Sequence, residues 1–496
     1  MPYLVWKHSG KNRYLVMRWK KRIDGIPTVT KEISIGSVER LAKIIEGDMD
    51  DVDLKSYDFG ATASVILMER KMGLKGIMDS VMGHHGTGHS PGDYSMIFIM
   101  NRLSDPKSKN GMHTWMQNDF ASTIYGSVTS QEFWNLMERF TDAHMESIMT
   151  LVKNKLLSMG YDFSRLFVDA SNMYTFMAEN SMAKKGHNKA HRYDLNQISY
   201  YIAANYDYIP LFWNSYPGNV HDSKTFQDMV RQIPNEAAVI FDRGYNSSSN
   251  VSLLDGRRYI GSLIMSDHPD LVRMPVEHDS FHETEKIVYG KNHRIIVYHS
   301  TKLQNRRVRT FIKRFTKVYA KVRKIVQSGD SDALTKARFY LESRNLNETI
   351  LLPDLRIDSE RMKSRFETLG RNAVFTSITD MSAHDVIDLY RKRNRVEHCF
   401  RTINTMDIAF PIYHWTDQKI RVHMFLSLLA YLFLALIYNE IRKHYADASL
   451  ASTTEYLKGI RVIYAARGKR VVKRVDCKSQ LSEKICSGMD LKSVMD

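Results

Sequence analysis

The sequence predicts an α/β protein built on a mixed β-sheet with helices packed against it, and three observations lead to this fold class. Two short apolar segments, 166–168 and 239–241, each run into an aspartate, as buried strands do before a loop. Two strand-like segments, 197–206 and 209–216, are separated only by Asp207-Tyr208, so a hairpin is the natural connection between them. An antiparallel hairpin beside two apolar strands indicates a mixed sheet covered by helices.

The patterning divides the chain into six segments, in keeping with 496 residues being too many for one hydrophobic core. Residues 266–370 contain a further strand pair around Lys291-Asn292 and a long basic helix. A later helix begins near Ala383, with Ser382 as its N-cap. The expected segments are a β-rich N-terminal unit at 1–55, a helical region expected to bind DNA at 56–159, the first part of the sheet at 160–265, the insertion at 266–370, the second part of the core at 371–445, and a basic C-terminal tail at 446–496.

The composition favours a polyanionic partner over a membrane or an oxidising compartment. Lys and Arg number 71 against 55 Asp and Glu, a net charge of +16 that suits nucleic acid, although a basic enzyme of another kind has the same balance. The three cysteines, Cys399, Cys477 and Cys486, match neither a zinc pattern nor a disulfide framework. Reduced thiols in a cytoplasmic protein fit these cysteines best. The longest apolar run, 424–438, is shorter than the roughly 20 residues of a membrane span, so we expect a buried core helix.

Two aspartates stand where the predicted strands give way to loops. Asp169 follows residues 166–168, and Asp242 follows residues 239–241 and precedes Arg243. Each aspartate taken singly is equally typical of a turn or a helix cap. Side chains at neighbouring strand ends of a mixed sheet converge on solvent, so the two carboxylates together predict a shared site for a divalent cation.

A third acidic residue, Glu397, lies in a predicted helical stripe. The stripe has the spacing i, i+3, i+7, i+11 and i+14, so a single helix would place all its members on one face. One interpretation is an exposed ladder of ion pairs, worth a few tenths of a kcal/mol per pair. The other interpretation is a metal-ligand glutamate between two arginines that hold phosphates. Tyr390 on the same stripe favours this second interpretation. The stripe consists of Tyr390, Arg393, Glu397, Arg401 and Asn404.

Two further basic segments favour phosphate contact. Residues 302–324 contain ten Lys and Arg and no acid, with apolar residues at helical spacing, which predicts an amphipathic helix whose cationic face meets DNA. The segment 186–192 lies between the first strand and the hairpin. It lacks the third histidine or the cysteine expected of a zinc site, so a phosphate-facing loop is preferred. Its candidate residues are His187, Lys189, His191 and Arg192.

These residues together resemble a known family. The order Asp169, Asp242 and Tyr390-x2-Arg393-x3-Glu397 is similar to that of prokaryotic insertion-sequence DDE transposases, whose catalytic helix carries a Tyr-x2-Arg-x3-Glu-x6-Lys signature. The lysine of that signature falls on Asn404, which brings no charge, so either Arg401 covers the loss or this copy is weakened. The likeness extends over about 100–440 and includes Asn101-Arg-Leu-Ser-Asp-Pro-Lys-Ser108, Gly186-His-Asn-Lys-Ala-His-Arg192, Tyr216-Pro-Gly-Asn219, His221-Asp-Ser-Lys224, Asp242-Arg-Gly244 and Val396-Glu-His-Cys-Phe-Arg401.

The resemblance implies a ribonuclease H-like fold: a five-stranded mixed sheet with the aspartates on neighbouring strands, the glutamate on a later helix, and an insertion between the second aspartate and the glutamate. It implies two Mg²⁺ ions, or Mn²⁺ in their place, held by Asp169, Asp242 and Glu397 during cleavage and joining of DNA. The implied partner is double-stranded DNA, both the terminal inverted repeats of the element and the target. A second copy of the chain is implied in the DNA complex. The implied location is the cytoplasm of a prokaryote, at the nucleoid. The implied DNA contacts are Tyr390, Arg393, Arg401, Asn404 and Arg243, with the loop residues named above.

Two alternatives keep part of this interpretation. A metal-dependent DNA nuclease would use the same carboxylates without joining the cleaved end to a second DNA. A catalytically decayed DNA-binding protein is motivated by Asn404 and by the basic surface.

Overall fold

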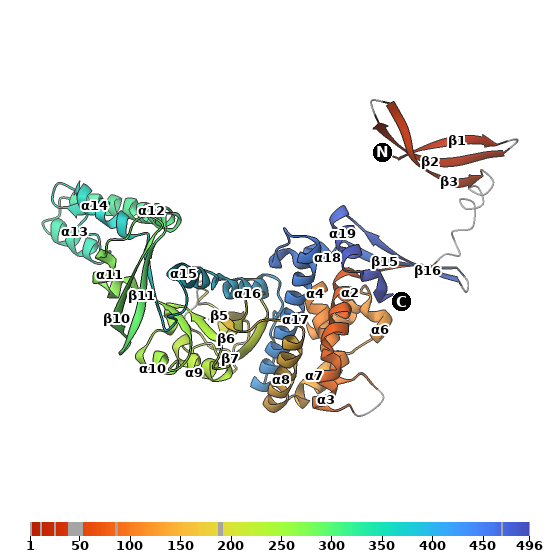
Figure 1. Cartoon of the computed structure of the whole chain (residues 1–496), viewed down its shortest axis with the longest axis horizontal. Coiled ribbons are helices and arrows are strands. Elements are labelled where there is room, and N and C mark those ends of the chain that lie inside the picture. Colours follow the sequence, from red (N-terminus) through yellow and green to blue (C-terminus); the bar gives the residue numbers. More distant parts are fainter. Residues whose placement is uncertain are drawn as a thin grey trace.

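The computed structural model describes residues 2–9, 12–23, 26–37, 53–84, 88–186, 192–467 and 470–495. A large β-sheet occupies the middle of the molecule, with an insertion at one end and a bundle of helices on the other side (Figure 1). The architecture is α/β with a mixed sheet, as the sequence predicts.

The central sheet has eight strands in the order β10-β11-β14-β9-β8-β5-β6-β7, so the expectation of five strands is wrong. The insertion contributes the β10-β11 hairpin, and β11 pairs antiparallel with β14, which extends the sheet of the core. Strands β5, β8 and β9 are mutually parallel, and the remaining pairings are antiparallel. The strands are β5 (Arg165–Thr175), β6 (Asn196–Ala204), β7 (Pro210–Pro217), β8 (Ala238–Phe241), β9 (Tyr259–Ser262), β10 (Phe281–Val288), β11 (Lys291–His299) and β14 (Arg371–Thr376).

The middle of the sheet forms from short apolar strands that are covered on both faces. All four residues of β8 are buried, as are Leu166 to Val168 of β5, which is the pattern of parallel strands between helices. Gly261 of β9 is required by packing, because a Cβ atom there would lie 2.5 Å from the Phe375 ring and 2.8 Å from the Phe241 ring. The tight centre of the sheet holds the two strands that carry the aspartates at a fixed separation.

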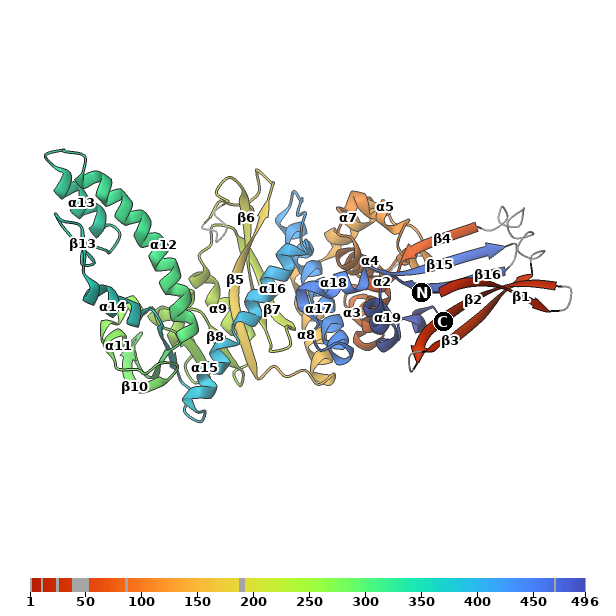
Figure 2. The same cartoon turned by 90° about the horizontal axis from the view of Figure 1, so that it is seen from above.

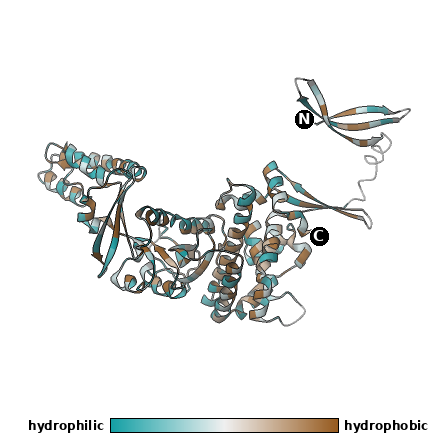
Figure 3. Ribbon diagram, in the orientation of Figure 1, coloured by the Kyte–Doolittle hydropathy of each residue, from teal (hydrophilic) through white to brown (hydrophobic). Residues whose placement is uncertain are grey.

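Helix α17 (Asp417–His444) is the core of the helical bundle. By length and composition it could cross a membrane, but 94% of its most apolar window is buried inside the protein. It packs against α2 (Gly60–Met72), α4 (Pro91–Ser104), α7 (Ser130–Arg139) and strand β7, and apolar colour gathers around it in Figure 3. The other core helices are α3 (Leu74–Met82), α5 (Met112–Met116), α6 (Ala121–Tyr125), α8 (Asp142–Ser158), α9 (Asp222–Gln232), α10 (Ser248–Ser252), α15 (Ala383–Arg391) and α16 (Asn394–Thr405).

The insertion has a small hydrophobic core of its own, separate from the main one. Phe315, Val318 and Val322 of α12 (Thr301–Val326) pack with Ala337 and Leu341 of α13 (Ala333–Glu342). Helix α12 leaves the edge of the sheet and runs away from it, as seen from above in Figure 2. The remaining elements are α11 (Pro269–Arg273), β12 (Ile350–Leu351), β13 (Arg356–Ile357) and α14 (Ser359–Thr368).

The segment expected to be a basic tail is folded. Strand β15 (Ile460–Arg467) pairs with β16 (Arg470–Cys477) on one side and with β4 (Asp53–Asp58) on the other, which joins two segments some 400 residues apart in the chain. Helices α18 (Thr453–Leu457) and α19 (Gln480–Gly488) pack beside this sheet. A further antiparallel sheet is formed by β1 (Pro2–Ser9), β2 (Asn12–Ile23) and β3 (Ile26–Ser37).

Candidate active site

The two aspartates are neighbours across the parallel pair β5 and β8. Val168 lies opposite Phe241, so Asp169, the next residue of β5, lies beside Asp242, the first residue after β8. Asp242 follows its strand, and its Oδ1 accepts a hydrogen bond of 2.8 Å from the Arg243 N–H. Asp169, only 6% exposed, lies within β5 rather than at its end, because the antiparallel partner β6 continues the pairing to Thr175. The expectation that a strand gives way to a loop at Asp169 is therefore wrong.

The glutamate is presented by a pair of short helices instead of one. Ser382 caps α15 as predicted, its side chain accepting from the Asp385 N–H. A tight turn at residues 392–393 then separates α15 from α16, because the amides of Arg393, Arg395 and Val396 bond three residues back rather than four. The single continuous helix is thus a wrong prediction. Val396, which is buried, lies on the inner side of α16, and Glu397 lies in its first turn with its side chain 45% exposed.

One guanidinium group contacts all three carboxylates. Arg393 places Nη1 3.4 Å from Asp169 Oδ2, and Nη2 3.7 Å from Asp242 Oδ2 and 2.8 Å from Glu397 Oε1. Burial opposes the charge of Arg393, but the surrounding carboxylates, Asp242 foremost, outweigh it and raise the pKa of the guanidinium above its ordinary value. Three acidic side chains that are 73 to 228 residues apart in the chain therefore converge on one cationic group.

A tyrosine and a serine complete the environment of Asp242. The Tyr390 hydroxyl donates to Asp242 Oδ1 over 3.4 Å, and the Ser262 hydroxyl, on β9, donates to the same oxygen over 3.3 Å. Burial and the nearby Asp242 charge raise the pKa of Tyr390 to about 12. Tyr390 is therefore a hydrogen-bond donor at neutral pH, and it fixes one oxygen of Asp242 while the other faces Arg393.

A cavity of about 180 Å³ lies beside Asp242 and Tyr390. Its walls bring in three residues that the sequence did not single out, Ser262, Tyr298 and Asn372, together with the predicted Arg243 and with Arg307 of the basic segment 302–324. Arg307 comes from the insertion and donates to Asn372 Oδ1 over 3.0 Å, a pairing across 65 residues that no local pattern signals. A larger hollow of about 530 Å³ between α8 and β7 contains none of the three carboxylates.

The other predicted residues lie further from this centre. Arg401 and Asn404 follow Glu397 on the exposed side of α16, and Asn404 Oδ1 is 3.5 Å from the Tyr200 hydroxyl of β6. The Arg192 guanidinium makes two bonds of 2.8 Å to Asp194. His187, Lys189 and His191 lie outside the described residues.

The donor set suits Mg²⁺ in its chemistry, since carboxylate oxygens are the hard ligands that this ion requires. The arrangement is not a preformed metal cage: in the part of the chain that the structure describes, no group of three or more His, Cys, Asp and Glu is spaced to hold an ion. The Arg393 guanidinium lies between the carboxylates and supplies positive charge there. The residues fit a divalent cation provided that the guanidinium withdraws.

Comparison with known proteins adds one match. Residues 161–433, more than half of the 496, match the family model described as the transposase DDE domain, and this range includes Asp169, Asp242 and Glu397. No curated protein matches the chain.

Proposed function

The chain belongs to the transposases that carry a DDE domain, and on that premise we propose that it cleaves the ends of a mobile DNA element and joins the freed 3′-hydroxyl to target DNA. The observation that carries this proposal is the convergence of Asp169, Asp242 and Glu397 on one cationic group. The placement of two aspartates on neighbouring strands and a glutamate on a later helix supports a ribonuclease H-like core of the kind found in prokaryotic insertion-sequence enzymes.

Asp169, Asp242 and Glu397 would hold two Mg²⁺ ions, or Mn²⁺ in their place. When bound, such a pair stabilises the negative charge that develops on the entering and leaving oxygens of a phosphodiester. The protein positions these ligands through its own contacts: Tyr390 and Ser262 fix Asp242 Oδ1, and the Ala170 N–H holds Asp169 Oδ1 over 2.9 Å.

Arg393 has two functions in this proposal. Without DNA it neutralises the three carboxylates, and with DNA its planar fork turns to a phosphate near the cleaved bond, for which a guanidinium is better suited than an ammonium. Arg243, at the cavity beside Asp242, would contact the same strand. Arg401 and Asn404, about 6 and 10 Å further along α16, would contact phosphates beyond it, Asn404 more weakly because it is uncharged.

The loop residues His187, Lys189, His191 and Arg192 stay predicted phosphate contacts. Because two element ends must be handled together, we also propose that two copies of the chain act in the DNA complex. The cytoplasm of a prokaryote, at the nucleoid, is the expected place of action.

The test uses the purified full chain with Mg²⁺ and a plasmid that carries the coding region with its natural flanking DNA, plus a second plasmid as target. We expect cleavage at the element ends and sequenced junctions between the 3′ ends and the target, both abolished by chelation and by Asp242→Asn. Cleavage without junctions would establish the nuclease alternative. DNA binding that is unchanged by Asp242→Asn, with neither cleavage nor junctions, would establish the decayed DNA-binding protein.

A further inference from the structure

Helix α12 carries ten basic side chains, and the structure divides them by orientation. Three contact the protein: Arg307 donates to the Leu369 carbonyl over 3.0 Å, Arg314 to the Arg344 carbonyl over 2.6 Å, and Lys321 lies over the Tyr340 ring. Six of the other seven lie on one face of the helix, opposite the buried Phe315, Val318 and Val322, and all six are exposed; the seventh, Arg323, is also exposed but lies to one side of this face. This face, the α12 stripe, consists of Lys302, Arg306, Arg309, Lys313, Lys317 and Lys324.

The α12 stripe is an unneutralised surface. Within the described ranges none of its six side chains forms an ion pair, whereas Lys336 on the neighbouring α13 pairs with Asp330. Helix α12 contains no acidic residue, and the stripe places like charges four residues apart at Lys313 and Lys317, an arrangement that destabilises a helix. The regularly spaced phosphates of DNA would relieve this repulsion along the whole stripe.

The position of α12 determines which part of a bound DNA the stripe would contact. Arg307, in the N-terminal third of α12, shares the 180 Å³ cavity with Asp242, so this end of the helix adjoins the catalytic carboxylates. From residue 302 to residue 324 the stripe runs about 33 Å at about 1.5 Å per residue, close to one turn of duplex, about 34 Å. Near its middle, Lys313 and Lys317 line a hollow of about 380 Å³ with Arg344.

We propose that the α12 stripe is a track for duplex DNA: it contacts the phosphates of the DNA that flanks the cleaved bond, over about one helical turn, without reading bases. This inference rests on the proposed function, because it places the reacting phosphate at the carboxylates. It assigns the insertion to substrate binding, through exposed side chains that form no ion pair with the residues that the structure describes.

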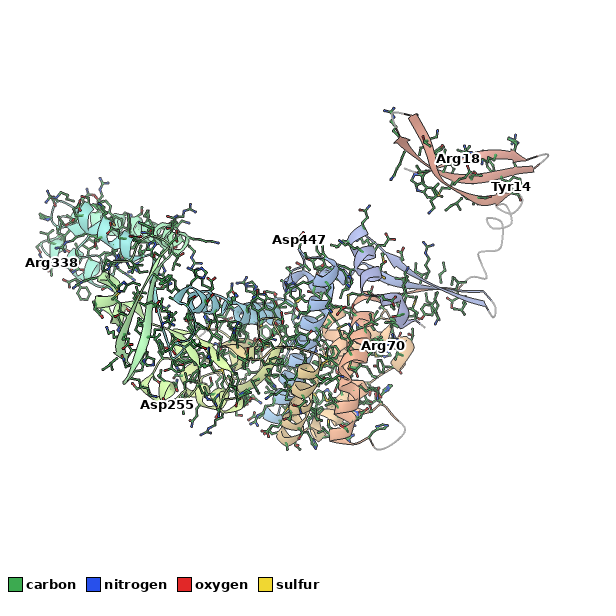
Figure 4. The ribbon with its side chains drawn as sticks, in the orientation of Figure 1. Tyr14, Arg18, Arg70, Asp255, Arg338 and Asp447 are labelled. Carbon is green, nitrogen blue, oxygen red and sulfur yellow. The ribbon has the colours of Figure 1, made fainter. Side chains whose placement is uncertain are left out.

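The test measures the salt dependence of binding to a fluorescein-labelled 30-base-pair duplex of random sequence, with all proteins in a cleavage-inert Asp242→Asn background. The track variant is Arg309→Gln/Lys313→Gln/Lys317→Gln. The matched control, Lys336→Gln/Arg338→Gln/Lys363→Gln, removes the same charge from α13 and α14 of the same insertion; Arg338 is labelled at the outer end of the molecule in Figure 4.

Each phosphate contact contributes about 0.9 to the slope of log K against log salt, so the track variant should have a slope shallower by about 2.7. The control should keep the parent slope. A track variant with the parent slope, or a control that loses as much, overturns the proposal.

Lysine acetylation of the unmutated chain gives a second readout that does not depend on how a variant folds. Bound duplex should protect Lys302, Lys313, Lys317 and Lys324 and leave Lys336 and Lys363 reactive; equal protection of both sets, or of neither, also overturns the track. If the chain joins DNA ends but the track variant keeps the parent slope and the stripe lysines are not protected, only this inference is refuted. A chain that binds through the track but never cleaves refutes the proposed function alone.

Discussion

Replacing Arg393 by methionine tests whether this side chain is the internal counter-ion of the three carboxylates. Asp242 raises the pKa of Arg393 most, but the contact with Asp169 contributes most to stability, because these two side chains are only 14% and 8% exposed and are shielded from solvent screening. Breaking such a buried pair by removing one partner costs about 3–5 kcal/mol. Asp242 and Glu397 are 36% and 45% exposed and therefore screened, so each adds about 0–1 kcal/mol. We expect Arg393→Met to lower the free energy of unfolding by roughly 4 kcal/mol.

The assay is calorimetric unfolding in EDTA followed by titration with Mg²⁺. At about 2.1 cal/mol/K of unfolding entropy per residue, a cooperative unit of this size shifts by about 1–2 °C per kcal/mol, so the variant should unfold roughly 4–8 °C below the unmutated chain in EDTA. Mg²⁺ should then raise the unfolding temperature of the variant more than that of the unmutated chain. A bound ion stabilises the folded state by mass action, and in the variant no guanidinium competes for the carboxylates.

Arg391→Met is the matched control for this experiment. Arg391 is 51% exposed, pairs with Asp388 over 3.4 Å on α15 and lies over the Tyr298 ring, so its loss should cost about 1 kcal/mol. If Arg393→Met were as stable as Arg391→Met in EDTA, or if the two responded equally to Mg²⁺, the counter-ion interpretation would be refuted.

Four further outcomes are expected. Glu397→Gln should abolish Mg²⁺-dependent cleavage and leave duplex affinity within a few fold, measured on one protein preparation. Asn404→Lys adds a cation beyond the site on α16 and should steepen the salt dependence of DNA binding by about 0.9; an unchanged slope would exclude a phosphate contact at this position. Gly261→Ala should cost about 1–3 kcal/mol in chemical denaturation, because its Cβ would lie 2.5 Å from a buried ring. Burial raises the pKa of Asp119 from its ordinary value to about 6. The protonated carboxyl therefore stabilises the fold below about pH 4, and this stabilisation is lost as the pH rises through about 6. Asp119→Asn should raise Tm more at pH 7.5 than at pH 4, and an equal shift at both pH values would contradict the raised pKa.

Local signals predicted the parts of the site that depend on one strand or one cap. The apolar approach to Asp242 forms a fully buried strand, and Ser382 caps α15, because both features are decided within a few residues. The short connection at Asp207-Tyr208 likewise fixes the hairpin of β6 and β7.

Features that depend on distant partners could not be predicted in the same way. The length of β5 beyond Asp169 is set by pairing with β6, and the size of the sheet is set by β11 meeting β14, more than 70 residues later. The break between α15 and α16 has no proline or glycine to announce it. That turn places Arg393 between the carboxylates, an arrangement that only the folded chain reveals.

Whether the three carboxylates bind metal is tested most directly by a crystal structure of the chain with Mn²⁺, in which the anomalous signal locates the metal. We predict anomalous peaks among the side chains of Asp169, Asp242 and Glu397, with the Arg393 guanidinium displaced from the carboxylates that it contacts in the free protein. Anomalous peaks only at other sites, with Arg393 still bound to all three carboxylates at a saturating concentration of Mn²⁺, would show that these carboxylates are not the metal ligands.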